Sequence, residues 1–370
     1  MKKIIAIIVS ALLILSLAVG CGSTQDPETP EIQYTKYQAQ FFNSFDTIIQ
    51  IIGYTETEEE FDRYAKLAEE EFLRLNNLFD RFHEYEGINN ICTINKNAGV
   101  APVEVPEEIL DLVEFSIQWY DETGGQTNIA MGPVLNIWHG YMEKYAGGSP
   151  DAVLPPMEEL EEAALHTDIT KVQVDREAGT VFLEEPEMML DVGAVAKGYA
   201  AQLVADLLYE EGFHSFLISA GGNIVTKDAP LDGIREKWGI GIQDPQKDSS
   251  DPNASSIEVV FAVNEAVVTS GDYQRFYMVG DQRVHHIIDP DTLMPASYYR
   301  GLTVVNDDSG LADLLSTALF CMDYDSCRAF AEEHDLKVLW IFADGTVEYT
   351  DNLLPQLRDR GGATASIEKS

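Results

Sequence analysis

The chain has 370 residues, 45% of them hydrophobic, and a formal net charge of −39 because 63 acidic residues outnumber 24 basic ones. A surface this acidic repels nucleic acid and anionic lipid headgroups, which excludes nucleic-acid binding as a function. An anionic ligand would need a local group of cations or backbone N–H donors to hold it.

The first residues have the pattern of a secretory signal. Met1 to Lys3 is short and positively charged, and Ile4 to Val19 is an apolar run that is too short for a membrane span of ~20 residues. We therefore predict a cleaved signal peptide over residues 1–20. Leu17 to Cys21 resembles the lipobox of lipoproteins, which implies lipidation of Cys21. An ordinary secretory signal with a chance cysteine is the alternative.

Lipidation would determine where the protein lies. Two or three acyl chains hold a protein firmly to a bilayer, so we expect a protein anchored to the cell membrane on its extracytoplasmic side. The polar stretch of residues 21–35, which contains prolines, is predicted to be a tether. A single folded unit over residues 36–355 and a flexible tail over residues 356–370 complete the predicted organisation.

The hydrophobic pattern of the remaining chain predicts an α+β fold. Phe41 to Ile52 is apolar and β-rich, which indicates a first strand, and Glu56 to Phe82 has apolar residues at three- or four-residue spacing, which indicates a long amphipathic helix. Further helices are expected at Glu107 to Thr123, Val134 to Tyr145, Ala194 to Glu211 and Leu311 to His334. Short strands are expected at Phe213 to Ser219, Trp238 to Ile242, Ile257 to Val263, Ala266 to Thr269, Val284 to Ile288 and Leu302 to Val305. Strands grouped between helical blocks favour α+β over a regularly alternating fold.

Two features point to structure rather than chemistry. Asp248 to Ser256 is dense in Asp and Ser and is predicted to be a surface loop. Besides Cys21 the chain has Cys92, Cys321 and Cys327, with no CxxC pair, and the last two lie six residues apart on one predicted helix. A disulfide framework or a zinc site is therefore not expected, and we predict buried free thiols.

Two glycine-containing segments could approach a ligand with their backbone. In Leu190 to Tyr199 a strand-like run ends at Asp191 and a glycine, and a helix then begins with Lys197 in its first turn. Such a turn presents N–H groups and a positive dipole end to an anion, although an ordinary strand-to-helix turn with a solvated lysine is also consistent with it. Ser219 to Asn223 contains two glycines and is most simply a tight turn.

Two further segments carry polar groups in apolar surroundings. Asp313 and Thr317 are four residues apart on a predicted helix, so a carboxylate and a hydroxyl share one face, as in a magnesium site completed by substrate phosphates. An aspartate that caps the helix is the alternative. His285 and His286 lie in an apolar strand before the turn at Asp289. One of them can accept a proton from a hydroxyl, or both are merely packed.

Together these segments, in this order, closely resemble the ApbE family of FAD:protein FMN transferases, including its lipoprotein members. The resemblance runs from about Phe41 to Val347. Further matches are the region from Asn95 to Gly99, the run from Thr123 to Trp138, and Val268 to Phe276. It implies an ApbE-like, T-fold-related, two-lobed single unit with antiparallel strands flanked by helices. It also implies a magnesium-dependent enzyme that splits FAD, attaches FMN to a threonine or serine of an exported acceptor protein, and releases AMP.

The resemblance also assigns roles to residues of this chain. It implies that Mg²⁺ is bound by Asp313, Thr317 and Ala194, the last through its carbonyl, and that His286 is the catalytic base. The implied flavin contacts are Phe45, Phe82, Gln126, Thr127, Asn128, Asp191, Lys197, His286 and Ile287. Departures from the family pattern occur at Phe82, Asn128, Ala130 and Leu293, which affect details of flavin binding rather than the metal ligands.

The acceptor motif of the family, roughly Dxx(S/T)GAT, is absent, and residues 361–364 resemble only its end. The acceptor is therefore expected to be another exported protein, such as a subunit of a redox pump or a reductase. Two other functions remain open at this stage: an FAD pyrophosphatase that yields FMN and AMP, and a lipid-anchored protein that binds flavin without turnover.

Overall fold

The computed structural model describes residues 33–247 and 256–363. The predicted signal peptide, Cys21, most of the predicted tether, most of the loop from Asp248 to Ser256 and residues 364–370 lie outside the described residues. From Tyr34 onward the described chain forms one compact unit. None of the described helices has both the length and the apolar character that crossing a membrane requires.

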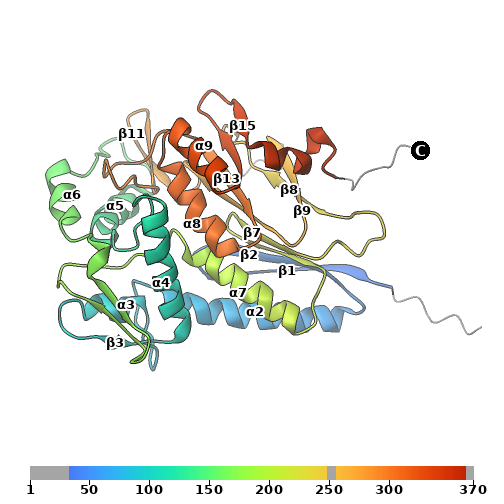
Figure 1. The fold of residues 1–370 in the computed structure, drawn as a ribbon, viewed down its shortest axis with the longest axis horizontal. Helices are drawn as coiled ribbons and strands as arrows, with labels where there is room; N and C mark the ends of the chain where they lie inside the picture. Colours follow the sequence, from blue (N-terminus) through green and yellow to red (C-terminus); the bar gives the residue numbers. More distant parts are fainter. Residues whose placement is uncertain (1–32, 248–255, 364–370) are drawn as a thin grey trace, which may run out of the picture. The chain divides into compact units, whose positions relative to one another are not determined.

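The described residues form an eight-stranded sheet in which every neighbouring pair is antiparallel (Figure 1). Its strand order is β1 (Thr35–Ser44), β2 (Thr47–Thr55), β6 (Phe216–Ala220), β7 (Asn223–Lys227), β10 (Ala266–Gly271), β13 (Gly301–Asn306), β14 (Lys337–Ile341) and β15 (Val347–Tyr349). The antiparallel sheet with helices packed against it confirms the predicted α+β fold class.

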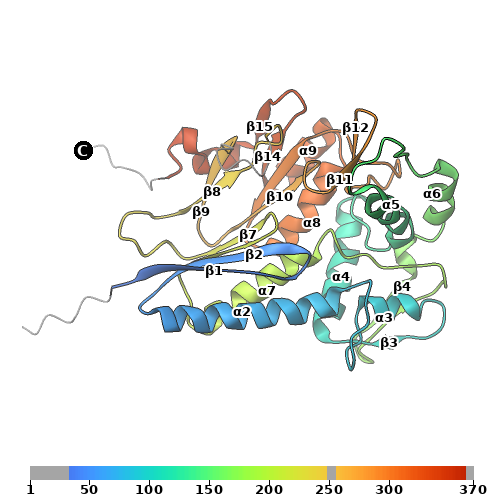
Figure 2. The same cartoon turned by 180° about the vertical axis from the view of Figure 1, so that it is seen from behind.

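The two faces of this sheet are apolar because side chains alternate along each strand. On β2 and β10, Ile51 and Val268 contribute to the larger core, whereas Ile52 and Val267 pack into a second core on the other face. The larger core also contains residues of helices α2 (Glu58–Phe79), α7 (Ala196–Glu210), α8 (Ser309–Phe320) and α9 (Tyr324–Glu333) (Figure 2). The second core contains residues of the β8 (Trp238–Ile242) and β9 (Glu258–Ala262) pair and of the 3₁₀ segment η2 (Asp351–Gln356), which η3 (Arg358–Arg360) follows.

The remaining elements lie at one end of the sheet in both views (Figures 1 and 2). They are α3 (Ile91–Lys96), α4 (Glu107–Glu122), α5 (Gly132–Tyr145), α6 (Met157–Ala164), the 3₁₀ segment η1 (Ile169–Lys171), the sheet of β3 (Val103–Glu104), β5 (Thr180–Leu183) and β4 (Val172–Asp175), and the hairpin of β11 (Phe276–Val279) and β12 (Gln282–His285). A third core joins α5, α6 and this hairpin around Trp138 and Tyr277. This end of the molecule carries most of the predicted site residues.

Helix α2 begins and ends where its sequence supplies hydrogen-bonding groups. Thr57 accepts a hydrogen bond from the Glu60 N–H as the N-cap, and three glutamates in the first turn suit the positive end of the helix dipole. After the last turn, the Asp80 carboxylate accepts hydrogen bonds from the N–H groups of Phe82 and His83. The helix therefore stops before the predicted residue Phe82, which lies in the following turn.

The predicted strand from Phe41 to Ile52 is wrong in one respect, since it is a hairpin. β1 and β2 are joined at Phe45 and Asp46, which have φ angles of 56° and 50°. Glycine or asparagine normally supplies these left-handed conformations, and a phenylalanine there gives no turn signal. The Phe45 N–H donates a hydrogen bond to the side chain of Asn76 at 2.7 Å, which helps hold the strained turn.

The predicted helix from Leu311 to His334 is two helices, α8 and α9. Cys321 is the C-cap of α8, and Asp323 starts α9 by accepting hydrogen bonds from the N–H groups of Asp325 and Ser326. Cys321 and Cys327 therefore lie on different elements. Both are buried and free, as is Cys92, which confirms the predicted buried thiols.

Candidate functional site

The N-terminal parts of α7 and α8 meet at Gly198 and Asp313. A Cβ atom on Gly198 would lie 2.4 Å from the Asp313 Cβ and 2.3 Å from the Ser309 carbonyl oxygen, so the backbones approach this closely only because the residue is glycine. The Gly198 N–H donates a 2.8 Å hydrogen bond to Asp313 Oδ2, and Lys197 Nζ lies 3.9 Å from the same oxygen. Two segments that are 115 residues apart in the chain thus form one charged centre.

We expect the substitution Gly198→Ala to lower the free energy of unfolding by about 2 kcal/mol, because its methyl group must push α7 and α8 apart. The matched control is Gly140→Ala in α5, where a Cβ atom meets nothing within 4 Å. That change should be neutral or raise the free energy of unfolding by about 0.5–1 kcal/mol, since alanine is the better helix former. Urea unfolding of both variants measures the difference, and equal stability of Gly198→Ala and wild type would contradict the close packing.

The residues at this junction fit a magnesium ion that is shared with a phosphate. Asp313 is 4% exposed, and burial raises the pKa of its carboxyl group, while Lys197 and the Gly198 N–H act in the opposite direction. A further cation would therefore offset the desolvation of this carboxylate. Thr317 lies half-buried one turn later on α8, and Ala194 lies half-buried just before α7.

The number of carboxylates at the α7–α8 junction also fits a magnesium ion. Among the described residues no group of three or more His, Cys, Asp or Glu side chains is placed to hold a metal. Magnesium is usually bound by one or two carboxylates together with phosphates and waters, so a single aspartate with neutral oxygens is sufficient for it. A calcium site or an all-protein zinc site would need more ligands than this junction supplies.

A second charged centre lies just before α7, at Asp191. One Asp191 carboxylate oxygen, Oδ1, accepts a 2.8 Å hydrogen bond from the Gly193 N–H, and the other, Oδ2, lies 3.2 Å from Arg81 Nε. The Asp191 N–H donates to the Ile129 carbonyl at 2.7 Å. In addition, the Asn95 side chain binds both backbone groups of Leu190, at 2.7 and 2.9 Å. The turn is thus held by three other parts of the chain.

The segment from Gln126 to Asn128 leaves polar atoms without partners. The side-chain oxygens Oε1 of Gln126 and Oγ1 of Thr127 are buried and accept or donate no hydrogen bond within the described part of the chain. Such an atom costs roughly 1–3 kcal/mol unless a ligand or water satisfies it. Asn128 differs, because its amide donates to the Thr167 carbonyl and its oxygen accepts from the Ala130 N–H. The first two residues are thus better placed to bind a ligand than Asn128.

His285 and His286 have different environments. His285 is buried, with Nε2 donating to the Ala296 carbonyl at 2.7 Å and Nδ1 accepting from the Ile287 N–H at 3.3 Å, so both its ring nitrogens are used. His286 lies just beyond the end of β12 rather than inside the predicted strand and is half-buried. Its Nδ1 donates to the Arg275 carbonyl at 3.3 Å. Its Nε2 is therefore the nitrogen that can accept a proton.

The charge state of His286 follows from its surroundings. Burial lowers the pKa of His286 to about 3, and the positive charges of Lys197 and Arg275 act in the same direction. The ring is therefore neutral near pH 7 when no anion is bound.

The predicted residues Phe45, Ile287 and Gln126 lie on three different parts of the fold. Phe45 lies half-buried at the tip of the β1–β2 hairpin, and the neighbouring Thr47 touches Gly221 closely enough that a Cβ there would lie 2.3 Å from Thr47 Oγ1. Gly221 and Gly222 form the tight turn between β6 and β7, with φ angles of 58° and 98°, as the sequence predicts. Ile287 is buried in the larger core, and Gln126 Nε2 donates to Asp291 at 3.0 Å.

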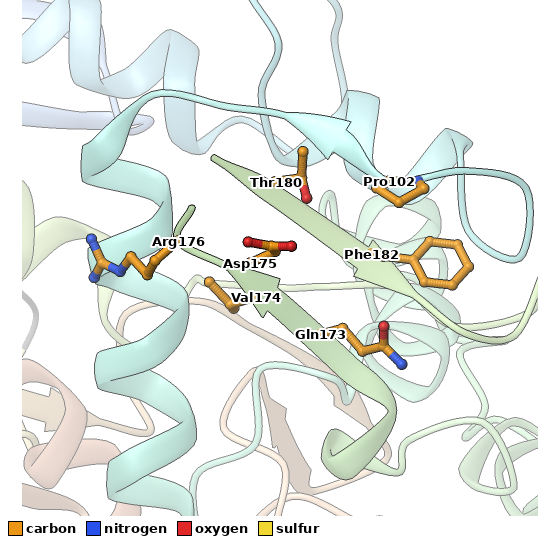
Figure 3. A pocket seen from close by; sticks show the side chains of 7 residues that line it. All are labelled: Pro102, Gln173, Val174, Asp175, Arg176, Thr180 and Phe182. Carbon is orange, nitrogen blue, oxygen red and sulfur yellow. The ribbon is translucent and has the colours of Figure 1, made fainter. Parts of the chain in front are cut away.

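A separate hollow lies on the three-stranded sheet (Figure 3). It has a volume of about 600 Å³, and its lining side chains come mainly from β4 and β5 and their connection. Arg176 at its edge is already paired with Asp111 and Glu114, and none of the predicted site residues lines it. We therefore place the chemistry at the α7–α8 junction and not in this hollow.

Some residues that contact the site were not predicted from the sequence. Arg81, His139 and Asn223 are the clearest, since Arg81 pairs with Asp191 and contacts His139, and Asn223 acts to lower the pKa of the Asp313 carboxyl group. The sequence contains a signal only for Asn223, which ends a segment that contains two glycines. An arginine or a histidine within a helical pattern is most simply a solvated residue, so Arg81 and His139 gave no signal.

The chain is similar to known proteins over most of its length. The model of the ApbE family matches residues 45–340. The chain is 31% identical to a protein of Treponema pallidum named FAD:protein FMN transferase, over 72% of this chain and 75% of that protein. It is 26% identical to a Klebsiella pneumoniae protein of the same name, over 92% of both chains.

A solved structure shows the same fold. The crystal structure of the ApbE protein from Thermotoga maritima superposes with a TM-score of 0.72 at 27% identity, covering 86% of this chain and 98% of the other. The two proteins therefore share one fold over most of the described residues.

Proposed function

Because the chain belongs to the ApbE family, we propose that it is an FAD:protein FMN transferase that depends on magnesium and attaches FMN to a threonine or serine of another protein. The observation that carries the proposal is the junction of α7 and α8, where the buried carboxylate of Asp313, the Lys197 ammonium group and the N-terminal end of α7 meet. This arrangement suits a diphosphate in a protein that is otherwise strongly acidic.

The diphosphate of FAD would lie across the turn from Asp191 to Lys197. The N-terminal end of α7 offers a positive dipole end, and Lys197 adds a full charge in the first turn. On the riboflavin side, the partnerless atoms of Gln126 and Thr127 are available to hydrogen-bond the ligand, and Phe82 offers an exposed ring. Phe45, Asn128, Asp191 and Ile287 complete the proposed contacts.

A magnesium ion would be held by the Asp313 carboxylate, the Thr317 hydroxyl and the Ala194 carbonyl. When bound, it would supply neutralisation of phosphate charge and orientation of the leaving group. The chain's own contribution is to keep Asp313 fixed: the Gly198 N–H holds one carboxylate oxygen, and the close approach of the two helices prevents the side chain from turning away.

His286 would act as the base. Its Nδ1–H is held by the Arg275 carbonyl, so Nε2 can take the proton from the acceptor hydroxyl. The hydroxyl oxygen forms a bond to the phosphorus on the riboflavin side, the bond from that phosphorus to the bridging oxygen breaks, and AMP leaves with the electron pair. The products are a phosphoester-linked FMN and AMP, with the proton on His286.

Binding of FAD should change the protonation of His286. In the free enzyme we expect the ring to stay neutral well below the ordinary histidine pKa of about 6.5 and to gain its proton only near pH 3. A bound diphosphate adds negative charge that opposes Lys197 and Arg275, so the pKa should rise. NMR titration of the His286 ring with and without FAD, in the absence of metal, measures both values. An ordinary pKa in the free enzyme, or one that FAD leaves unchanged, would contradict this electrostatic description.

Two alternatives use the same site. With water in place of the hydroxyl, the enzyme would be an FAD pyrophosphatase that yields FMN and AMP. A lipid-anchored protein that only captures flavin would bind FAD without turnover and without magnesium. The buried carboxylate of Asp313 and the neutral ring of His286 favour chemistry over capture, since simple binding needs neither a base nor a buried carboxylate.

The proposed partner is an exported protein that carries a Dxx(S/T)GAT-like motif, such as a redox pump or reductase subunit, and the proposed location is the extracytoplasmic side of the cell membrane, through a lipid on Cys21. The test is to incubate the enzyme with FAD, magnesium and a peptide that contains this motif, and to measure the mass of the peptide. We expect the mass of one FMN on the Ser or Thr, with equimolar AMP. FMN and AMP with no modified peptide would favour the pyrophosphatase, and unchanged FAD would contradict both enzymatic functions.

A further inference from the structure

Arg81 is the centre of a buried cluster that none of the predicted roles includes. Its guanidinium group contacts four neighbours: Asp191, at 3.2 Å from Nε, the Nδ1 atom of His139 at 2.5 Å, the sulfur of Met189 at 3.3 Å, and the ring of Phe82, whose centroid is 4.4 Å from Cζ. The Arg81 and Asp191 side chains are only 5% and 7% exposed. One arginine thus joins the turn after α2, helix α5 and the segment before α7.

The chemistry of the cluster requires an arginine with a neutral histidine. Arginine has only donors, so Nδ1 of His139 must accept, and the His139 proton lies on Nε2. Burial lowers the pKa of His139, and Arg81 and Arg275 act in the same direction, whereas Asp191 and Glu143 oppose them. A lysine could supply the charge, but its single ammonium group could not hydrogen-bond His139 and Met189 while it also paired with Asp191.

A purely structural role explains this cluster poorly. Burying an ion pair costs several kcal/mol of desolvation per ion, and well-packed apolar residues of similar volume often give equal or greater stability. The cluster also opens to solvent at one point, because Phe82 is 54% exposed while its inner face packs on Arg81. The two side chains that Arg81 holds from opposite sides, Phe82 and Asp191, are both proposed flavin contacts.

We propose that Arg81 is a positioning residue that orients Phe82 and Asp191 together for the flavin half of FAD. The inference rests on the proposed function. The guanidinium fixes the Asp191 carboxylate, whose other oxygen holds the Gly193 N–H, and the same group fixes the plane of the Phe82 ring. Arg81 itself is covered by these neighbours and acts through them. Its loss should therefore weaken FAD binding and leave turnover at saturating FAD within a few-fold of wild type.

The test is a double-mutant cycle on FAD affinity, measured by flavin fluorescence with the full chain. Arg81→Gln and Asp191→Asn should each raise the Kd of FAD by about tenfold, which equals ~1.4 kcal/mol. The double variant leaves no unpaired buried charge. It should bind FAD no more weakly than either single variant, because each single change already abolishes the same Arg81–Asp191 ion pair. Effects that multiply in the double variant would mean that Arg81 acts independently of Asp191 and would overturn the proposal.

Two further variants separate positioning from stability. Arg81→Lys keeps the positive charge, so its melting temperature should be close to that of wild type while its FAD affinity stays as low as that of Arg81→Gln. Normal FAD affinity in Arg81→Lys would overturn the proposal. Arg176→Gln removes an exposed arginine that is paired with Asp111 and Glu114 and with none of the proposed site residues, and it should bind FAD like wild type. If wild type binds FAD and Arg81→Gln binds equally well, only this inference fails. If wild type itself does not bind FAD, the proposed function fails.

Discussion

The substitution Asp313→Ala is expected to lower the rate of FMN transfer by about a thousandfold at saturating magnesium. Asp313 supplies the only carboxylate among the proposed metal ligands. A metal ion can stabilise the transition state of phosphate transfer by several kcal/mol. Because each ~1.36 kcal/mol of barrier changes the rate tenfold, the loss of this ion corresponds to an effect of this size. Because a buried charge is removed together with its desolvation cost, the fold should persist. Transfer to a peptide acceptor, measured by mass over a magnesium titration, gives the rate.

The matched control for this variant is Asp308→Asn. Asp308 caps the same helix by accepting a hydrogen bond from the Leu311 N–H, and asparagine caps equally well. The control should keep both stability and transfer. A rate for Asp313→Ala within a few-fold of wild type, at any magnesium concentration, would show that this aspartate does not hold the metal.

The substitution His286→Ala is expected to lower transfer by about 10²–10⁴-fold, which is the usual contribution of a positioned general base. FAD affinity should fall much less than transfer does, because the main loss concerns the proton of the acceptor hydroxyl. The effect should also shrink as pH rises, since hydroxide or an ionised acceptor replaces the base. Single-turnover transfer between pH 6 and 9 measures both effects.

His285→Gln is the neighbouring control, since it alters the adjacent histidine of the same segment. His285 donates to the Ala296 carbonyl and is buried, so its replacement should lower the melting temperature but leave transfer by the folded protein within a few-fold. If instead His285→Gln lost transfer and His286→Ala retained it, the assignment of the base would be reversed.

Much of the fold follows from periodicity, and the errors occur where local signals are weak. The helix at α2 is predicted because its apolar residues repeat at helical spacing, whereas the Thr57 cap at its start is seen only in the structure. The β1–β2 hairpin is missed because Phe45 adopts a left-handed conformation without a glycine or asparagine. The break between α8 and α9 is missed because the apolar spacing continues across Asp323, so its capping role is visible only in the structure.

The site residues likewise fall into those that the sequence predicts and those that only the structure shows. The spacing of Asp313 and Thr317 on one helix face is readable from the sequence, since it depends on a single element. The contact of Asp313 with Lys197 is not, because it depends on the approach of two helices at Gly198. Arg81 is the extreme case, since its contacts come from helix α5 and the segment before α7, both distant from it in the sequence.

The most direct test of the proposed site is a crystal structure with FAD and Mn²⁺ in place of Mg²⁺, with the metal located by its anomalous scattering. We predict one peak bound by the Asp313 carboxylate, the Thr317 hydroxyl and the Ala194 carbonyl, with the FAD diphosphate beside Lys197. A peak elsewhere, or a nucleotide bound away from the α7–α8 junction, would contradict the proposed mechanism.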